Sequence, residues 1–358
     1  MPPLKCGIGY YSSRLLNYFD SKDKITVLTS PEFGLESDKY TIKHVKSWKV
    51  RHLVNTIQLI KSTKPDVISL QYPAMGYGRQ IGINILPYLI RKMPISLTLH
   101  EYHSSPLLGR MRNLITALPV QKIIVSNPYD FQALPRFLQK KTLVIPIGSN
   151  IERVPANRTT FDDIVRDAGF NERKPIGVFF GFAFKSKGLD LLLSAVEKAD
   201  SQLLILSELS EDNPFQKSIL DRVSTLRQKG VKVYSAGHLS DKKVSEAMRG
   251  CTYFVLPQRM PITAKSGTAI AASIHGVPVV STGGDKKSLN LPYKHNENAL
   301  LLNPMNLQTL SNTLKDISSD PELIERLASG ARGLAEYFDW DSIAREHQAL
   351  WRLLKDGK

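Results

Sequence analysis

Two short segments of the chain combine lysine, glycine and hydroxyl side chains in the way that phosphate sites do. The first is Lys185–Gly188, and the second is Lys265 followed by Ser266-Gly267-Thr268. Small apolar residues over 269–274 predict a helix after the second segment, and 277–280 predict a buried strand. Unpaired N–H groups and the helix dipole attract anions at such a helix start. A simple helix cap is the alternative interpretation of Ser-Gly-Thr, and the presence of the first segment favours the phosphate site.

The elements that must position these segments alternate between strand and helix. Apolar runs predict further strands over 25–29, 67–71, 95–99, 122–126, 142–147, 176–180, 202–206, 231–234 and 253–256. Helical spacing predicts helices over 10–19, 54–60, 83–90, 189–198, 215–229, 241–248, 307–317, 321–338 and 341–354. This alternation predicts an α/β fold with doubly wound parallel sheets. Ligands of such folds bind at the carboxyl ends of the strands.

Composition predicts an ordinary globular protein with more than one domain. The chain has 358 residues, 42% of them hydrophobic and 23% charged, and a length like this favours two domains of roughly 150 to 200 residues. The sequence has neither an apolar run of about 18 residues nor a signal peptide. The two cysteines, Cys6 and Cys251, form no metal-binding pattern. We therefore expect a reducing, cytoplasmic setting.

Positive charge is concentrated in the first half of the chain. Residues 1–150 hold 20 Lys and Arg against 8 Asp and Glu, whereas residues 151–358 hold 28 against 25. Such an excess fits an anionic membrane surface, an anionic acceptor or nucleic acid, or it is only a solvated basic face. The sequence has no basic run of five, no zinc-finger spacing and no aromatic RNA-binding motif, so we expect no nucleic-acid partner.

The pattern divides the chain into four parts. Residues 1–150 and 174–337 each carry a strand–helix series, and the polar stretch 151–173 is the expected interdomain region. Residues 338–358 form a final helix that we expect to pack back on the N-terminal domain. A Pro/Gly turn over residues 2–9 opens the chain.

Five segments in order resemble the retaining GT-B glycosyltransferases, and glycosyltransferase family 4 most of all. Those segments are PPLKCGIGYYSSRLL with PDVISLQYP and SLTLHEYH, then GVFFGFAFKSKGLDLLLSAV, GHLSDKKVSEAMRGCTYFVLP, SGTAIAASIHGVPVVST, and the ending NALLLNPMNLQTLSNTLKDISSDPELIERL with FDWDSIAREH. The resemblance covers nearly the whole chain. It implies two Rossmann-like domains facing across a cleft, the first on the acceptor side and the second binding a nucleotide-sugar.

The resemblance also implies roles for individual residues. Catalytic roles fall on His100, Lys187 and Lys265, of which the two lysines would stabilise charge on a departing diphosphate. Donor contacts fall on Gly7, Gly9, Gly181, Gly188, His238, Leu239, Ser266, Gly267 and Thr268. Glu101 and His103 are further candidates beside His100. No metal ligand and no cofactor are implied. Each assignment has a structural alternative, namely a solvated lysine, a plain glycine turn or a structural histidine.

The chain departs from the family pattern at three places. Family 4 usually carries two glutamates, eight positions apart, around the donor helix, but here the matching positions hold Ala264 and Ala272 in one register and Thr263 and Ala271 in the other. Phe182 stands where an arginine often follows the strand glycine. A strand usually precedes the first glycine loop, so the first strand is either missing here or truncated.

The function implied is that of a metal-independent, retaining hexosyltransferase. It would move a sugar from a nucleoside-diphosphate donor to a hydroxyl of a glycan or lipid-linked acceptor, in cell-surface polysaccharide or glycolipid synthesis. We expect a cytoplasmic protein that can sit peripherally on an anionic membrane, at the inner face of the cell membrane. Because the glutamate pair is missing, a non-catalytic GT-B partner of an active transferase stays open. A sugar-nucleotide epimerase or a phosphorylase is a further alternative. The sequence leaves the sugar, the base, the acceptor and the oligomeric state open.

Overall fold

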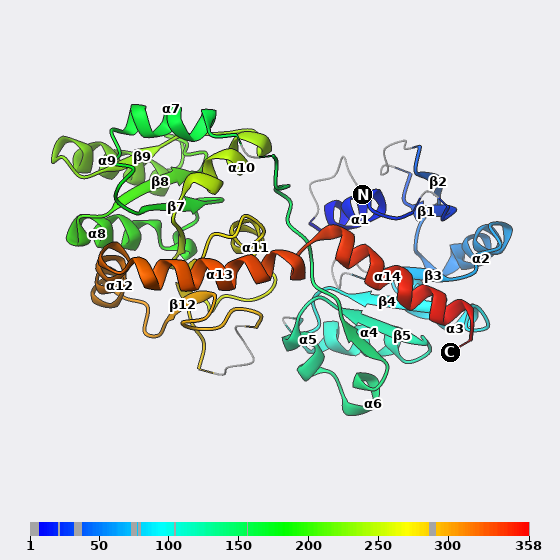
Figure 1. The fold of residues 1–358 in the computed structure, drawn as a ribbon. Coiled ribbons are helices and arrows are strands. Elements are labelled where there is room, and N and C mark those ends of the chain that lie inside the picture. Colours follow the sequence, from blue (N-terminus) through cyan, green and yellow to red (C-terminus); the bar gives the residue numbers. More distant parts are fainter. Residues whose placement is uncertain are drawn as a thin grey trace. The chain divides into compact units, whose positions relative to one another are not determined.

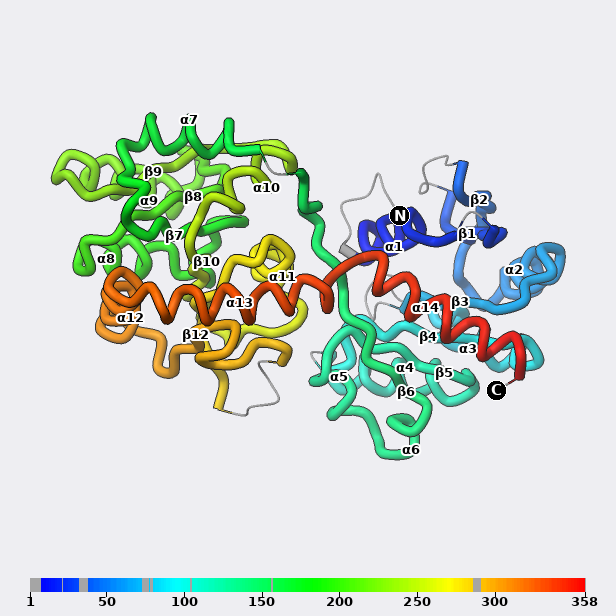
Figure 2. Tube along the Cα trace, viewed as in Figure 1, coloured from blue at the N-terminus to red at the C-terminus, as the bar shows by residue number. Residues whose placement is uncertain are grey.

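The computed structural model describes residues 7–20, 22–31, 38–72, 77, 80–103, 105–155, 157–285 and 291–357. The chain forms two compact units (Figure 1). Unit 1 contains Met1–Gly148 and Trp340–Lys358, and unit 2 contains Ser149–Asp339. Figure 2 follows the chain from one unit to the other, and its last segment, in red, belongs to unit 1.

Unit 1 is built on a parallel sheet of four strands. Its strands are, in order, β3 (Ile68–Tyr72), β4 (Ile95–Leu99), β5 (Lys122–Val125) and β6 (Thr142–Val144). All five residues of β4 are buried, as expected for a central strand of a parallel sheet covered on both faces. Strands β1 (Ile25–Thr29) and β2 (Tyr40–His44) pair in a separate parallel sheet.

The helices of unit 1 include elements that the sequence did not predict. They are α1 (Gly7–Asn17), α2 (Leu53–Ser62), α3 (Gly82–Leu89), α4 (Leu107–Ala117), α5 (Pro128–Ala133), α6 (Arg136–Gln139) and α14 (Trp340–Lys355), with a 3-10 turn η1 (Val50–His52). Strand β2 and helices α4, α5 and α6 were not expected.

The predicted turn over residues 2–9 is wrong for its described part, because α1 already begins at Gly7 and contains Gly9. Residues 2–6 lie outside the described residues. Tyr11 and Leu15 of α1 are buried in one cluster with Trp340 and Ile343 of α14. Glycine weakens a helix by only about 1 kcal/mol, so the burial of this apolar face outweighs the propensity of the two glycines.

Unit 2 is a doubly wound sheet. Its six parallel strands are β7 (Ile176–Phe180), β8 (Gln202–Leu206), β9 (Val233–Ser235), β10 (Tyr253–Leu256), β11 (Val279–Thr282) and β12 (Ala299–Leu302). They lie in the order β12-β11-β10-β7-β8-β9. The chain thus builds outwards from β7 on one side and then returns to build from β10 on the other. Such a reversal creates a switch point between β7 and β10, at the carboxyl edge of the sheet.

Seven helices are described in unit 2, and the first of them falls in the predicted interdomain region. They are α7 (Thr159–Ala168), α8 (Leu189–Ala199), α9 (Pro214–Gln228), α10 (Asp241–Gly250), α11 (Gly267–Ile274), α12 (Leu307–Ser319) and α13 (Pro321–Tyr337), with a 3-10 turn η2 (Lys185–Lys187). Helix α7 was not predicted, and it belongs to unit 2.

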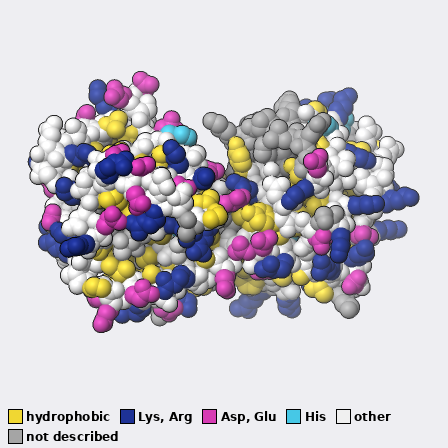
Figure 3. Space-filling model, turned by 45° about the horizontal axis from the view of Figure 1, so that its top comes forward, with side chains coloured by type: hydrophobic (Ala, Val, Ile, Leu, Met, Phe, Trp, Pro, Cys, Tyr) yellow, Lys and Arg dark blue, Asp and Glu magenta, His cyan; other side chains and the backbone are white. Residues whose placement is uncertain are grey.

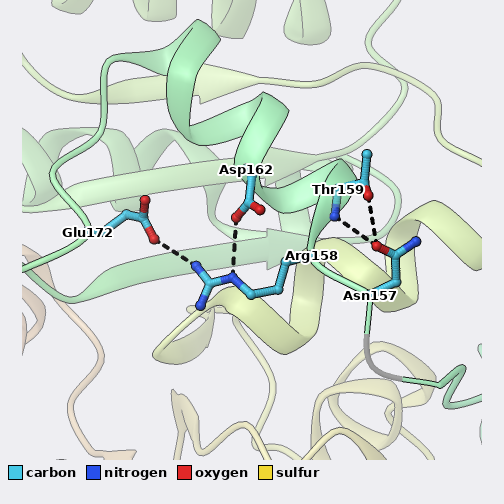
Figure 4. A network of polar contacts seen from close by, with 5 residues as sticks. All are labelled: Asn157, Arg158, Thr159, Asp162 and Glu172. Carbon is cyan, nitrogen blue, oxygen red and sulfur yellow. Dashed lines mark hydrogen bonds and ion pairs between the residues drawn. The ribbon is translucent and has the colours of Figure 1, made fainter.

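A network of polar side chains lies at the exposed start of α7. Arg158 bonds to Glu172 at 2.7 Å and to Asp162 at 3.2 Å, while Asn157 Oδ1 accepts bonds from Thr159 (Figure 4). These exposed pairs contribute little stability. The buried face of α7, with Phe161 and Ile164 among its residues, holds the helix on unit 2. In the part of the chain that the structure describes, no helix is long and apolar enough to cross a membrane.

Candidate active site

The switch point of unit 2 brings three segments to one edge of the sheet. The first follows β7 and runs through Gly181 to η2. The second follows β10 and contains Pro257 and Gln258, and the third is the start of α11. The backbone N–H of Arg259 donates to the carbonyl of Ser186 at 3.0 Å, so the first two segments are joined directly.

Lys187 is the charged group at this place. Its side chain is half-buried, and its Nζ donates a hydrogen bond of 3.0 Å to Oε1 of Gln258. Desolvation by burial lowers the pKa of Lys187 below its ordinary range. Among the described residues, no carboxylate lies within ion-pair distance of Lys187. Since a partly buried cation without a counter-charge is costly, this ammonium is suited to an anionic ligand.

Gln258 holds the lysine in place and is itself fixed. It is only 8% exposed, its Nε2 donates to the carbonyl of Pro261 at 3.4 Å, and its own carbonyl accepts a hydrogen bond from Thr282. Gln258 was not predicted from the sequence. The available signal was its place directly after the apolar strand and proline of residues 253–257.

Two glycines allow the segments to approach closely. Gly181 has φ +117°, and a Cβ there would lie 2.5 Å from Cγ2 of Thr268. Gly188 has φ +71°, and a Cβ there would lie 2.2 Å from the carbonyl oxygen of Pro257. Both backbone conformations and both contacts require glycine. The structure therefore brings together Gly181 with Thr268, and Gly188 with the end of β10.

The start of α11 supplies backbone donors. Ser266 is its N-cap residue and makes no side-chain cap bond to the helix. The first intrahelical bond runs from Ile270 N–H to the Ser266 carbonyl at 2.9 Å, which leaves the N–H groups of the first turn without a partner inside the helix. Gly267 is exposed, with open space around the position of a Cβ. Lys265 is half-buried, and its backbone N–H donates to Thr263 Oγ1 at 3.2 Å.

His238 and Leu239 lie after β9, at the edge of the same sheet. The His238 side chain is exposed, with its Nδ1 3.6 Å from a carboxylate oxygen of Glu208. Leu239 is half-buried. Within the described residues, no hydrogen bond or ion pair joins either of them to Lys187 or to the start of α11.

The remaining candidates belong to unit 1. His100 directly follows β4 and is 7% exposed, and its Nε2 lies 3.0 Å from Oε1 of Gln71. Gln71 Nε2 in turn donates to Ser69 Oγ and Thr98 Oγ1, which fixes the amide so that its oxygen faces the imidazole. In the tautomer that carries its proton on Nε2, His100 therefore donates a hydrogen bond to Oε1 of Gln71.

The helix with the two N-terminal glycines also reaches His100. Tyr11 of α1 packs edge-on against the imidazole, with the ring centres 5.2 Å apart. Neither Tyr11 nor Gln71 was predicted from the sequence. Glu101 and His103 are exposed beside His100, and the backbone N–H of His103 donates to Asp130 at 2.6 Å. Across the described residues, no group of three or more His, Cys, Asp or Glu side chains could hold a metal ion.

Comparison with known proteins gives a family for unit 2. Residues 160–334 match the family model for "Glycosyl transferases group 1", so the chain carries a glycosyltransferase group 1 domain. A search of curated proteins gave no match.

Solved structures resemble the chain over nearly its whole length. A glycosyltransferase from Rickettsia africae ESF-5 is 15% identical with a TM-score of 0.76, covering 100% of this chain and 98% of that chain. Anabaena HepE in complex with UDP is 16% identical with a TM-score of 0.73, covering 98% and 97%. Sucrose-phosphate synthase from Thermosynechococcus elongatus is 16% identical with a TM-score of 0.65, covering 98% and 92%. The predicted α/β class with a two-domain GT-B fold is confirmed.

Proposed function

We propose that this protein is a glycosyltransferase whose nucleoside-diphosphate sugar donor binds at the β7/β10 switch point of unit 2. The observation that carries the proposal is Lys187, a half-buried ammonium with a neutral amide partner and, among the described residues, no carboxylate in reach. The group 1 domain over residues 160–334 supports the same donor class. So does the UDP bound to the structural neighbour HepE.

In this proposal the chemistry of the site is stabilisation of a leaving group. When the bond between sugar and diphosphate breaks, negative charge grows on the diphosphate oxygen. Lys187, Lys265 and the N–H groups at the start of α11 would stabilise that charge without reorganising. The reaction as proposed uses no metal ion and no cofactor.

The finer parts of the proposal concern the acceptor. A hydroxyl of a glycan or lipid-linked acceptor attacks from the face that the diphosphate leaves, which retains the anomeric configuration, as in family 4. His100 is assigned as a contact of the transferred sugar, and Gln71 as the residue that orients it. Gly7 and Gly9 lie within α1. We assign their backbone groups to contacts with the donor.

Release of nucleoside diphosphate from a panel of nucleotide-sugars tests this function. Each donor is incubated with full-length protein and simple glycoside or glycolipid acceptors, and proton NMR follows the anomeric signal of the product. The proposal predicts turnover of one donor, retention of its configuration, and loss of most activity in Lys187→Ala. An inverted product contradicts the assigned stereochemistry, and turnover that Lys187→Ala leaves unchanged contradicts the site.

A non-catalytic GT-B partner is the second candidate. The observation in its favour is that Ala264, Ala271 and Ala272 are fully buried alanines at positions where family 4 usually carries carboxylates. This candidate predicts no nucleotide binding at all, so a binding measurement separates it from transfer. An epimerase, by contrast, would convert the donor without any acceptor in the same NMR experiment.

A further inference from the structure

Helix α4 of unit 1 exposes the residues that a helix of a soluble domain normally buries. Its outward residues are Leu107 and Leu108, each 76% exposed, Met111 at 50%, Ile115 at 44% and the following Leu118 at 50%. At about 100° per residue, these five side chains fall within an arc of about 100° of the helix surface. We call these five residues the α4 stripe.

The inward face of α4 is polar and fixed by hydrogen bonds. Asn113 and Thr116 are buried there. Asn84 of α3 donates to Thr116 Oγ1 at 2.6 Å, and Arg112 donates to Oδ1 of the same Asn84 at 3.2 Å. Because a buried polar group must keep its partners, α4 cannot rotate to bury the stripe within unit 1. The fold therefore holds the stripe outwards.

The neighbouring helix extends the apolar surface. Tyr88 of α3 donates through its hydroxyl to the carbonyl of Ile115 at 2.9 Å, and it is 40% exposed. Leu89, the next residue, is 54% exposed. Tyrosine combines an apolar ring with a polar tip, which suits the boundary between an apolar phase and water.

The segment of unit 1 that carries the stripe is rich in basic residues. Residues 80–148 contain eight basic residues, which are Arg91, Lys92, Arg110, Arg112, Lys122, Arg136, Lys140 and Lys141. The same stretch has two acids, Glu101 and Asp130, and Asp130 is buried. Over the described residues 80–103 and 105–148, Glu101 is thus the single exposed acid. Figure 3 shows acidic and basic side chains interspersed on the face of unit 2 at the left.

We propose that the α4 stripe docks this protein onto an anionic lipid bilayer. An apolar helix face that lies in the interface, flanked by basic residues that reach anionic headgroups, is the combination that holds a helix on a membrane. A protein partner could cover five apolar side chains, but it would not by itself require that the segment carrying them be this poor in exposed acid. The proposal does not depend on the nucleotide site of unit 2.

Vesicle co-sedimentation of the full-length protein tests the docking. Vesicles of phosphatidylcholine, with and without phosphatidylglycerol, are compared for the wild type and Leu108→Gln/Met111→Gln. A matched control is Leu307→Gln/Leu353→Gln, which changes two exposed leucines of α12 and α14. We expect the stripe variant to bind anionic vesicles about tenfold more weakly or worse, and the control to bind like the wild type. Arg91→Gln/Lys92→Gln should weaken binding and reduce its dependence on salt.

Three outcomes would overturn the proposal. They are a wild type that does not bind anionic vesicles, a wild type that binds neutral vesicles equally well, and a stripe variant that binds like the wild type. Sedimentation velocity addresses a second copy of the chain as the occupant. A wild-type dimer that the stripe variant makes monomeric, without vesicle binding, would assign the stripe to self-association instead. Circular dichroism of each variant confirms that it is folded.

Discussion

Lys187 Nζ and Gln258 Oε1 lie 3.0 Å apart, although their positions in the chain are separated by 71 residues. The parallel pairing of β7 with β10 places the two residues at one edge of the sheet. A neutral amide positions the ammonium without cancelling its charge. The lysine is thus available to an anionic ligand, whereas a carboxylate at position 258 would compete with that ligand.

Replacing the amide by a carboxylate tests this relationship. In Gln258→Glu the new carboxylate would pair with Lys187, raise the pKa of the lysine and neutralise its field. We expect nucleoside-diphosphate affinity to fall about tenfold or more, which is about 1.4 kcal/mol. The buried carboxylate cannot donate to the Pro261 carbonyl as the amide does, so we expect the new ion pair to leave the resistance to urea no higher than that of the wild type. Calorimetry and urea denaturation measure the two effects, and unchanged affinity would remove Lys187 from the phosphate site.

The contact between Gly181 and Thr268 gives a second prediction. Gly181→Ala meets both an unfavourable φ and Cγ2 of Thr268 at 2.5 Å, so we expect a loss of about 2–4 kcal/mol in the free energy of unfolding. Thr268→Ser removes Cγ2 and should restore part of that loss in the double variant. Gly237→Ala is the matched control, because Gly237 has φ +69° but open space around it. It should lose only about 1 kcal/mol.

Acid should destabilise unit 1 through His347. This histidine of α14 is buried, with Nε2 3.0 Å from the Tyr11 hydroxyl, and desolvation lowers its pKa from 6.5 to about 4. The unfolded chain therefore binds a proton that the folded chain does not, between pH 6.5 and about 4. The stabilisation is complete above pH 6.5 and is lost as the pH falls towards 4, by about 3 kcal/mol in total.

Tryptophan fluorescence can follow this loss, because all three tryptophans, Trp48, Trp340 and Trp351, belong to unit 1. We expect His347→Gln to flatten the dependence of the urea midpoint on pH. The exposed His44 serves as the control, and His44→Gln should keep the wild-type dependence. Equal slopes in His347→Gln and the wild type would show that another group carries the acid sensitivity.

His100 gives a prediction about catalysis rather than binding. If the imidazole contacts the transferred sugar, His100→Ala should lower kcat by about 100-fold and leave the Kd for nucleoside diphosphate unchanged. Gln71→Leu removes the partner that orients the ring, so it should lower kcat less, again at constant Kd. His100→Ala with a normal kcat would leave the histidine a structural role only.

Unit 2 could be predicted well from the sequence because its strands are short apolar runs bounded by glycine, proline or polar residues. The predicted strands over 176–180, 202–206 and 253–256 match β7, β8 and β10 in their bounds. Helix α7 was missed, although Phe161, Ile164 and Val165 line its buried face, because the charged residues between them made the stretch read as polar. Helix α4 was missed because its inward face is polar, while its apolar residues face outwards.

Some residues of the candidate site could be predicted from the sequence, and others could not. Lys187, Gly188 and Thr268 belong to local motifs, so they could be selected from the sequence. In the structure each of them lies at the switch point of unit 2. Gln258 and Tyr11 belong to no motif. They reach Lys187 and His100 only through the strand order of unit 2 and the packing of α1. Partners that come together through topology are not encoded in spacing along the chain.

Calorimetric titration of the full-length protein with UDP, GDP, ADP and dTDP shows whether Lys187 lies in a nucleotide site. It is run on the wild type, Lys187→Ala and Lys185→Ala, the last being an exposed lysine of the same η2 turn. We expect one nucleotide to bind the wild type and Lys185→Ala alike, and to bind Lys187→Ala at least about tenfold more weakly. If none of the four binds the folded wild type, or if both lysine variants bind equally well, the donor site is not where Lys187 lies.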